Sequence, residues 1–450
     1  MTRQDTIFAL ATPPGRSALG VIRVSGPAAK AVLHAVAGGV PPPREAALKR
    51  LRDPATGEML DEALVLWFPA PASETGEDIA ELQVHGSRAV IGGLSEALAA
   101  LPGVRLAEPG EFARRAFYNG KLDLTAAEGL ADLIDAETQA QRRQALLQSS
   151  GALGRLYDGW RAAILEAMAL VEAGIDFSDE GDTAAATYAS ACQLVETGVL
   201  PALRAHLDDG RRGEIVRNGF RVVIAGPPNA GKSSLINALA RRDVAIVSPE
   251  AGTTRDVIEV ALDLGGMPVI VSDTAGIRDA TGLVEQEGIR RTFARAGEAE
   301  LVLWLIDGAD PEPAGTALPA PLQGLPVIRV LSKSDLVHAA ADAAGSRHDA
   351  ELAVSSTTGA GLPELVGAIA ERVQGDMPAP DAPAITQARH RRHLEQVLAS
   401  LEAFLAGGAR HPELRAEELR QAAAEIGAIT GRIGAEDVLD RIFSRFCIGK

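Results

Sequence analysis

Residues 226–233, with the sequence GPPNAGKS, match the phosphate-binding pattern G-x-x-x-x-G-K-[ST]. They directly follow the apolar run 222–225 and precede a helical pattern over 234–240, which is the strand and helix context that a P-loop requires. In such a loop backbone N–H groups surround the phosphates, the lysine neutralises them and the hydroxyl binds Mg²⁺. Lys232 and Ser233 are therefore predicted to bind nucleotide phosphates and Mg²⁺.

Two further polar segments complete the predicted phosphate site. Residues 273–276, Asp-Thr-Ala-Gly, follow the apolar run 269–272, so Asp273 is expected at a strand end that faces the P-loop. The loop 251–256, Ala-Gly-Thr-Thr-Arg-Asp, lies between these motifs and offers adjacent hydroxyls. We predict that Thr254 in this loop is the Mg²⁺ ligand that senses the γ-phosphate.

The choice of base is predicted from residues 332–335, Ser-Lys-Ser-Asp, which follow the apolar run 327–331. A carboxylate at Asp335 can accept hydrogen bonds from guanine N1–H and its 2-amino group, whereas adenine has no 2-amino group and leaves the carboxylate unpaired. The stem of Lys333 is expected along the base face. Residues 355–357, Ser-Ser-Thr, can offer backbone N–H groups to guanine O6. Together these segments resemble a Ras-like GTPase domain.

Two positions depart from that resemblance. Ras-like GTPases usually carry N-K-x-D at the base loop, and this chain has Ser332 in place of the asparagine. The change removes an amide that normally ties this loop to the P-loop, so weaker nucleotide retention is expected. Ile277 stands where Ras has the glutamine that orients water. Because an aliphatic side chain cannot orient water, hydrolysis must use another group.

The elements around these motifs predict several domains. Short β-like runs broken by Pro and Gly precede residue 122, and long Ala-, Leu- and Glu-rich helical patterns lie on both sides of a segment in which strands and helices alternate. The predicted fold is therefore multidomain, with an α/β domain inserted into one helical domain. The predicted bounds are 1–122 for an α+β N-terminal domain, 123–217 and 378–450 for an all-α helical domain, and 218–377 for a Ras-like α/β P-loop domain.

Composition limits the partners and the compartment. The net charge is −16, which excludes attraction of the whole molecule to nucleic acid or anionic lipid, so a nucleic-acid contact needs a local basic patch. The longest apolar runs fall far short of the ~18 residues of a membrane span, and we expect no membrane contact. The chain has 2 cysteines, too few for a disulfide framework, so we expect the reducing cytosol. Most basic residues are arginine, which makes the few lysines candidates for specific roles.

Motifs outside the α/β segment carry a resemblance to a family. They include DTI at 5–7, ATPPGR at 11–16, GVIRVSG at 20–26, TGED at 75–78, EPGEF at 108–112, KLDL at 121–124 and the terminal FSRFCIGK at 443–450. With the inserted GTPase segment, the chain resembles the tRNA modification GTPase family MnmE, also called TrmE, from end to end.

The resemblance implies an activity and partners. Members act in the cytoplasm with the FAD-dependent flavoprotein MnmG (GidA), which uses FAD and NADH. Together they add a (carboxymethyl)aminomethyl group to C5 of the wobble uridine, position 34, of certain tRNAs. The one-carbon donor is a 5-formyl- or 5,10-methylene-tetrahydrofolate bound by a folate-binding N-terminal domain. The resemblance also implies K⁺-dependent GTP hydrolysis, a homodimer and a heterotetramer with the flavoprotein.

The resemblance also implies roles for individual residues. Glu285 takes the water-orienting role, and Cys447 lies near the folate site with its chemistry open. The Mg²⁺ ligands are Ser233 and Thr254, the K⁺ ligands are Asn229, Ser248, Glu250 and Thr253, and the folate contacts are Arg23, Glu81, Lys121 and Lys450. Arg23 and the lysines suit carboxylates of the glutamate tail and Glu81 the pterin edge. The GTP contacts are Asn229, Ala230, Gly231, Lys232, Ser233, Ser234, Ser248, Pro249, Glu250, Ala251, Gly252, Thr253, Thr254, Asp273, Thr274, Ala275, Gly276, Ser332, Lys333, Ser334, Asp335, Ser355, Ser356 and Thr357.

Two other functions fit part of the sequence. An RNA-binding or ribosome-assembly switch GTPase shares the P-loop and Ile277 but lacks the N-terminal motifs and the terminal Cys-Ile-Gly-Lys. A folate enzyme with a vestigial GTPase domain agrees with Ser332 but not with the retained Lys232 and Asp273. For tRNA, the basic cluster 389–393 and Arg211, Arg212 and Arg217 are either phosphate contacts or solvated helix faces.

Overall fold

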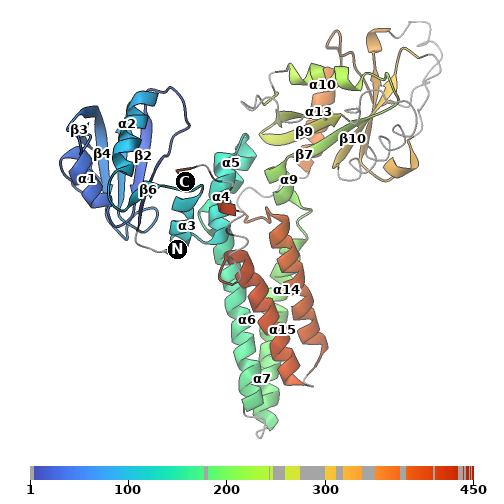
Figure 1. Cartoon of the computed structure of the whole chain (residues 1–450). Coiled ribbons are helices and arrows are strands. Elements are labelled where there is room, and N and C mark those ends of the chain that lie inside the picture. The colour runs from blue at the N-terminus through green and yellow to red at the C-terminus, as the bar shows by residue number, and fades with distance from the viewer. Residues whose placement is uncertain are drawn as a thin grey trace, which may run out of the picture. The chain divides into compact units, whose positions relative to one another are not determined.

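The computed structural model describes most of the chain, which divides into two compact units (Figure 1). One unit comprises Met1–Ala131, Leu147–Leu200 and Gln396–Lys450, and the other comprises Asp132–Leu146 and Pro201–Glu395. Over the described residues, no helix combines the length and the apolar character needed to cross a membrane. The described residues are 5–176, 181–242, 244–246, 259–273, 299–310, 318–336, 350–375, 382–408, 411–433, 439, 442–444, 446 and 448–449.

The N-terminal part contains a six-stranded sheet with the strand order β3-β4-β5-β2-β1-β6. Neighbouring strands pair antiparallel except β1 and β6, which are parallel. The short β-like runs expected before residue 122 include 20–24, 63–68 and 79–84, which lie in β2, β4 and β5. The strands are β1 (Thr6–Leu10), β2 (Gly20–Ser25), β3 (Ala47–Arg52), β4 (Met59–Phe68), β5 (Ile79–Val84) and β6 (Val104–Leu106).

The two faces of this sheet pack differently because side chains alternate along each strand. Ile22 and Val24 point into a core that also holds residues of α1 (Ala29–Ala37) and α2 (Arg88–Ala99). The opposite face buries Ile7 and Ala9 against Phe112 of helix α3 (Glu111–Tyr118). Arg23 of β2 therefore lies on the α3 face of the sheet, where its guanidinium is 5.9 Å from the centre of the Phe112 ring.

A network of partly buried ion pairs ties α3 to the sheet. Glu111 accepts hydrogen bonds from Arg105 at 2.5 Å and from Arg115 at 2.9 Å. Asp5 also accepts from both arginines, at 2.6 and 3.0 Å, and Arg115 reaches Glu77 at 3.2 Å. Burial raises the pKa of the Glu111 carboxyl, but the hydrogen bonds from Arg105 and Arg115 outweigh burial, and the pKa is lowered below its usual 4.5.

The helical pattern expected before the α/β segment, which runs from 125 to 172, is divided into three helices. The first break ends in a capping box, in which Thr138 Oγ1 accepts from the Gln141 N–H and Gln141 Oε1 accepts from the Thr138 N–H. The second break lies at Gly151, whose φ of +77° favours glycine. The helices are α4 (Leu124–Ile134), α5 (Gln139–Ser149) and α6 (Ala152–Asp176).

The remaining helices of the all-α part include long partners of α6. In Figure 1, α7 and α15 run alongside α6, and residue contacts confirm both pairings. Their cores include Tyr157, Ile164, Leu419 and Ile426, all fully buried. These helices are α7 (Gly181–Gln193), a π-helix (Leu194–Val199), α8 (Leu200–Leu207), α9 (Arg212–Asn218), α14 (Ala388–Ala406) and α15 (Pro412–Thr430).

The second sheet has the order β12-β11-β10-β7-β9-β8, and only β8 runs antiparallel to its neighbour. The apolar runs 222–225, 269–272 and 327–331 lie in β7, β9 and β11, and the edge strand β8 was not anticipated. The predicted fold class of α+β, all-α and P-loop α/β parts is confirmed. The elements are β7 (Phe220–Ala225), α10 (Lys232–Ala240), β8 (Glu259–Leu264), β9 (Met267–Asp273), β10 (Leu301–Asp307), β11 (Val327–Ser332), β12 (Leu352–Ala353), α13 (Leu362–Gly375) and short 3₁₀ turns at Ala320–Leu322 and Ser334–Leu336.

We predict that Glu111→Gln destabilises the N-terminal sheet by about 2 kcal/mol at neutral pH, because it removes a charged acceptor from two arginines. The lowered pKa of Glu111 means that this stability is present above pH 4.5, the ordinary value, and is lost as the pH falls through the folded-state pKa. The difference between variant and parent should therefore shrink in acid.

The measurement is urea unfolding followed by Trp67 fluorescence, with Trp160→Phe and Trp304→Phe in the background so that Trp67 is the sole tryptophan. Glu62→Gln is the matched control, since its ion pair with Arg50 is exposed. A Glu111→Gln effect that stays constant from pH 7 to pH 3 contradicts the assignment.

Candidate functional site

The nucleotide motifs lie at one edge of the second sheet. β7, β9 and β11 run in the same direction, and each ends where a predicted motif begins. Because carboxyl ends of parallel strands meet at the same edge, the P-loop, Asp273 and residues 332–335 come together. The P-loop itself joins β7 directly to the first turn of α10, two residues earlier than the helix start predicted from sequence.

The P-loop backbone depends on glycine where the loop begins. Gly226 has a φ of +155°, and a Cβ added there would lie 2.7 Å from the Leu305 carbonyl oxygen on β10. Gly231, with a φ of +87°, occupies the N-cap of α10, so the first N–H groups of the helix follow it. Asn229 adopts a φ of +63°, a left-handed conformation that asparagine tolerates better than most residues.

The phosphate-site side chains contact one another as their types predict. The Lys232 ammonium donates to the carbonyls of Gly226 and Pro227 at 3.0 and 2.9 Å. Ser233 Oγ donates to Asp273 Oδ2 at 2.7 Å, and Asp273 is buried. Burial lowers the pKa of Lys232, and the opposing charge of Asp273 reduces that shift. A hydroxyl and a carboxylate at this spacing are the hard oxygen donors that suit Mg²⁺.

Ser332 ties the base loop to the P-loop without the amide that Ras-like domains usually carry there, and the expected weaker nucleotide retention stays a prediction. Its hydroxyl donates to the Ala230 carbonyl of the P-loop at 2.7 Å and also lies 3.1 Å from the Ile306 carbonyl. Ser332 is buried at the end of β11, so this hydrogen bond is shielded from water. A short hydroxyl therefore makes the link between the two loops that an asparagine amide was expected to make.

The rest of the base loop is held from both sides. Lys333 Nζ pairs with Asp307 Oδ2 at 2.6 Å, and the Ser334 N–H donates to the Val354 carbonyl at 3.1 Å. Ser355 is fully buried, and its Oγ accepts from the Thr358 N–H. Asp335 is exposed in the Ser334–Leu336 turn. The loop therefore presents one carboxylate to solvent on a fixed backbone.

Several predicted site residues cannot be placed. They lie outside the described residues, and their roles stay predictions: Ser248, Pro249, Glu250, Ala251, Gly252, Thr253, Thr254, Thr274, Ala275, Gly276, Glu285, Cys447 and Lys450.

A second constellation lies on the α3 face of the N-terminal sheet. Arg23 on β2 stands opposite Glu81 on β5, and the guanidinium donates to the Glu81 carboxylate at 3.2 Å. Glu74 from the loop before β5 pairs with the same guanidinium at 2.7 Å. The side chains of Arg23 and Glu81 are only 17% and 20% exposed. This ion pair is therefore largely shielded from solvent and is not an exposed surface pair.

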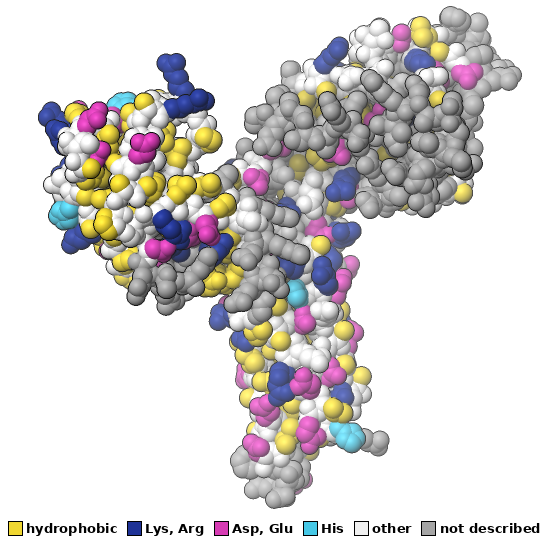
Figure 2. Space-filling view, in the orientation of Figure 1, with side chains coloured by type: hydrophobic (Ala, Val, Ile, Leu, Met, Phe, Trp, Pro, Cys, Tyr) yellow, Lys and Arg dark blue, Asp and Glu magenta, His cyan; other side chains and the backbone are white. Residues whose placement is uncertain are grey.

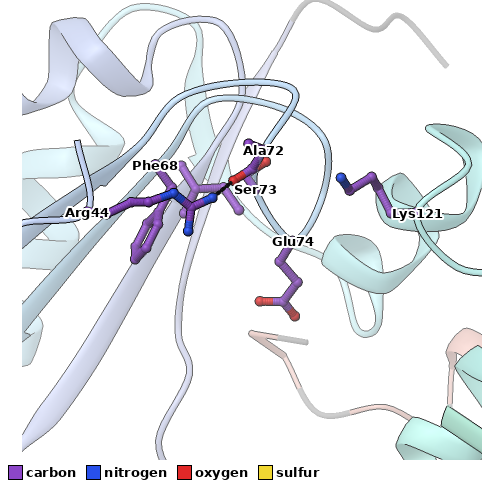
Figure 3. A pocket seen from close by; sticks show the side chains of 7 residues that line it. Arg44, Phe68, Ala72, Ser73, Glu74 and Lys121 are labelled. Carbon is purple, nitrogen blue, oxygen red and sulfur yellow. Dashed lines mark hydrogen bonds between the residues drawn. The ribbon is translucent and has the colours of Figure 1, made fainter. Parts of the chain in front are cut away.

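A pocket of about 420 Å³ adjoins this ion pair (Figure 3). Lys121, a predicted folate residue, lines it and donates to the Pro71 carbonyl at 2.9 Å. Glu74 lines the pocket and also pairs with Arg23. It therefore connects the predicted folate residues Arg23 and Glu81 with Lys121. The lining residues are Arg44, Phe68, Ala72, Ser73, Glu74, Ile79 and Lys121.

The C-terminal segment comes back to the N-terminal sheet. Ile448 forms an isolated antiparallel bridge with Pro109, and a Cβ added to Gly449 would lie 2.4 Å from the Leu10 carbonyl oxygen. Leu10 follows Ala9, the residue that stands opposite Arg23 in the β1–β2 pairing. Ile448 and Gly449, which lie between Cys447 and Lys450 in the sequence, are therefore close to the strand β1 that pairs with β2 at Arg23.

The basic clusters proposed for tRNA are largely neutralised. Arg391 pairs with Asp209 at 2.7 Å and with Glu214, and Arg217 pairs with Asp132 at 2.9 Å. Figure 2 shows basic and acidic side chains interspersed over the visible face of the long helices rather than separated by sign. Of the basic residues that were named, Arg211, Arg212 and Arg392 are exposed, and Arg211 pairs with Glu214.

Sequence reasoning missed Arg44 and Glu74. Glu74 directly precedes the TGED motif at 75–78, and Arg44 directly follows the prolines at 41–43, so each was adjacent to a feature that was noted. Neither residue belongs to a pattern whose chemistry is readable from spacing. Both residues line one pocket because the loops before β3 and β5 fold next to Phe68.

Two family models and several relatives match the chain. The family described as GTP-binding protein TrmE N-terminus matches residues 6–121, and the MnmE helical domain family matches residues 124–447. A tRNA modification GTPase MnmE from Parvibaculum lavamentivorans is 53% identical over 99% of this chain and 100% of its own length. One from a Methylobacterium species is 51% identical over the same shares. The solved G domain of the T. maritima FeoB iron transporter is similar over 35% of this chain and 97% of its own, with 25% identity and a TM-score of 0.25.

Ser332→Ala is predicted to weaken GDP and GTP binding about fivefold, because it removes one buried hydrogen bond worth about 1 kcal/mol between the base loop and the P-loop. Ser332→Thr keeps the hydroxyl and should retain most of the affinity. Titration with a fluorescent guanine nucleotide measures both. Equal affinity for the parent and Ser332→Ala would mean that the link contributes nothing to nucleotide retention.

Proposed function

The chain belongs to the MnmE family of tRNA modification GTPases, and from that premise we propose a specific activity. It uses K⁺-dependent GTP hydrolysis to drive the addition of a (carboxymethyl)aminomethyl group at C5 of the tRNA wobble uridine, in the cytoplasm. It does so with the flavoprotein MnmG, which holds FAD and NADH, and with a tetrahydrofolate as one-carbon donor. The observation that carries this proposal is the full-length similarity together with the hydrogen bond between Ser233 and Asp273, next to Lys232 on the same P-loop.

In the GTPase reaction the described residues bind and orient the nucleotide. Lys232 is assigned to the β- and γ-phosphates, the N–H groups at the start of α10 to the phosphate oxygens, and Ser233 to Mg²⁺. Asp335 is assigned to guanine N1–H and the 2-amino group. Mg²⁺ and K⁺, when bound, supply positive charge that stabilises the transferred phosphoryl group. Thr254 completes the assignment for Mg²⁺.

K⁺ is assigned to the exposed side of the P-loop. Asn229 is exposed there, in a left-handed backbone conformation, so its side-chain amide is accessible to a cation from solvent. A neutral oxygen ligand suits a monovalent cation, since it adds no charge that would favour a divalent one. Ser248, Glu250 and Thr253 complete this assignment, and Glu285 is assigned to orient the attacking water.

The folate is assigned to the α3 face of the N-terminal sheet. Arg23, Glu81 and Lys121 lie around Glu74 beside the 420 Å³ pocket, which provides both donors and acceptors next to the apolar walls of Phe68 and Ile79. A ligand with an aromatic body and carboxylates needs that combination. Lys450 completes the set, and Cys447 is assigned to the same area.

A homodimer through the N-terminal domains has physical support from exposed apolar side chains. Leu48 on β3 stands opposite Leu64 on β4, and they are 65% and 42% exposed. Both lie at the β3 edge of the sheet, where burial against a second copy would remove apolar area from water. The dimer is proposed to assemble with the flavoprotein into a heterotetramer.

The K⁺ assignment predicts that GTP hydrolysis with Mg²⁺ is at least tenfold faster in KCl than in NaCl at equal ionic strength, because K⁺ adds charge stabilisation at the phosphates. Asn229→Ala should remove most of the difference, and Glu285→Ala should lower the rate in both salts. Steady-state phosphate release measures the rates. Asn218→Ala is the control, since its side chain contacts only Arg217 among the described residues.

Equal slow rates of the parent chain in both salts would oppose the K⁺ assignment and favour a binding switch that waits for an external activator. The modification itself is tested by incubating tRNA with the chain, the flavoprotein, FAD, NADH, GTP and a tetrahydrofolate, followed by nucleoside mass spectrometry. Unmodified wobble uridine in the complete mixture would contradict the proposed function.

A further inference from the structure

The pocket of the N-terminal domain contains two cations that face it from different elements. Arg44 comes from the segment before β3, and Lys121 comes from the turn after α3. Figure 3 shows their side chains extending toward the 72–74 loop from opposite sides. We propose that Arg44 and Lys121 together form a carboxylate-binding subsite that holds the glutamate tail of the folate. This inference rests on the folate-binding role given above and adds Arg44 to it.

The charge balance of the area separates this subsite from the Arg23 pair. The guanidinium of Arg23 is already neutralised, since Glu74 and Glu81 both pair with it. An anionic group could bind Arg23 only by displacing one of these carboxylates. Arg23 is therefore a poor choice for the glutamate tail, although its residue type first suggested that role.

Arg44 and Lys121 are in the opposite situation. Arg44 donates to the Ala72 carbonyl and Lys121 donates to the Pro71 carbonyl at 2.9 Å, and both acceptors are neutral. Within the described parts of the chain, neither cation has a carboxylate at ion-pair distance. Glu74, the one carboxylate in the lining, already pairs with Arg23, so the pocket carries excess positive charge.

Arg44 is held in place before any ligand arrives. Its φ of +65° is a left-handed backbone conformation, which costs a non-glycine residue roughly 1 kcal/mol. Its N–H donates to the Trp67 carbonyl at 2.8 Å, and its guanidinium lies 5.7 Å from the centre of the Phe68 ring. Strain of this kind persists only where the surroundings fix the residue, and it is concentrated at ligand-binding positions.

The loop between the two cations is fixed by α3. Asn119 Nδ2 donates to the Thr75 carbonyl at 2.7 Å, and Arg115 reaches Glu77 at 3.2 Å. Ser25 Oγ donates to the same Glu77 carboxylate at 2.8 Å. A rigid wall reduces the entropy that is lost when a ligand binds, so the subsite is preorganised for a ligand of fixed length.

The ligand chemistry follows from the two cations and the apolar walls. A glutamate tail carries an α-carboxylate and a γ-carboxylate on one short chain, and a planar guanidinium can bind one carboxylate with two parallel hydrogen bonds. Phe68 and Ile79 provide apolar surface for the aminobenzoyl ring that precedes the glutamate. The subsite therefore reads the anionic end of the folate, and the Arg23 area is left for the pterin.

The experiment compares two ligands on the full chain by isothermal titration calorimetry. One is 5-formyl-tetrahydrofolate and the other is 5-formyl-tetrahydropteroate, which lacks the glutamate. The parent should bind the glutamate-bearing ligand at least tenfold more tightly. Arg44→Asn, chosen because asparagine tolerates the left-handed backbone, should weaken that ligand about tenfold and leave the glutamate-free ligand unchanged.

Arg50→Asn is the matched control, because Arg50 is an exposed arginine of β3 paired with Glu62 outside the pocket. Arg44→Gln is the second variant, and it should give the same ligand-selective loss. Equal weakening of both ligands by Arg44→Asn and Arg44→Gln would assign Arg44 a purely structural role and overturn the subsite.

Two further outcomes overturn the subsite. Unchanged binding of 5-formyl-tetrahydrofolate by both Arg44 variants would remove Arg44 from the site while the folate function stands. The same conclusion follows if the variants lose affinity for tRNA alone, since the cation would then bind a phosphate. A parent chain that binds neither folate ligand would contradict both the subsite and the folate role.

Discussion

The parallel pairing of β7 with β9 and β10 is the constraint on which the nucleotide site depends. Its register brings Ala225, the last residue before the P-loop, and Asp273, the last residue of β9, to the same edge of the sheet. The contact between Ser233 and Asp273 follows from that register, because the P-loop leads from β7 into the first turn of α10, where Ser233 reaches the end of β9. A slip of one residue would turn Asp273 to the other face of the sheet.

The same sheet core reaches beyond the P-loop segment. Val216 of α9 is buried in it, and Ala140 of α5 packs against it. The Ala140 N–H donates to the Gly266 carbonyl at 3.0 Å, in the turn between β8 and β9. One end of β9 therefore carries Asp273, and the other end adjoins α5, which lies far before the P-loop in the sequence. The nucleotide site and this helix are parts of one packed core.

The sequence predicted what depends on local pattern and failed where distant loops meet. The P-loop and the strands of the second sheet were readable because Gly226 to Ser233 is a contiguous motif between a strand and a helix. Edge strand β8 was missed because its alternating burial leaves only Leu262 and Leu264 fully inside. Arg44 and Glu74 were missed because their meeting depends on two loops, and no spacing in the sequence encodes it.

Ser332 shows that a motif rule can mislead when it is applied as a list of residue types and the hydrogen bond behind it is not considered. The rule asks for asparagine, but the structure needs a buried donor that reaches the Ala230 carbonyl, and a hydroxyl at 2.7 Å supplies one. A vestigial domain has no reason to keep such a bond beside Lys232, whose pKa is lowered by burial. The half-buried ammonium of Lys232 is bonded to two neutral carbonyls, at 3.0 and 2.9 Å. A phosphate would give this cation an anionic partner, and the retained arrangement therefore argues for a site that still binds nucleotide.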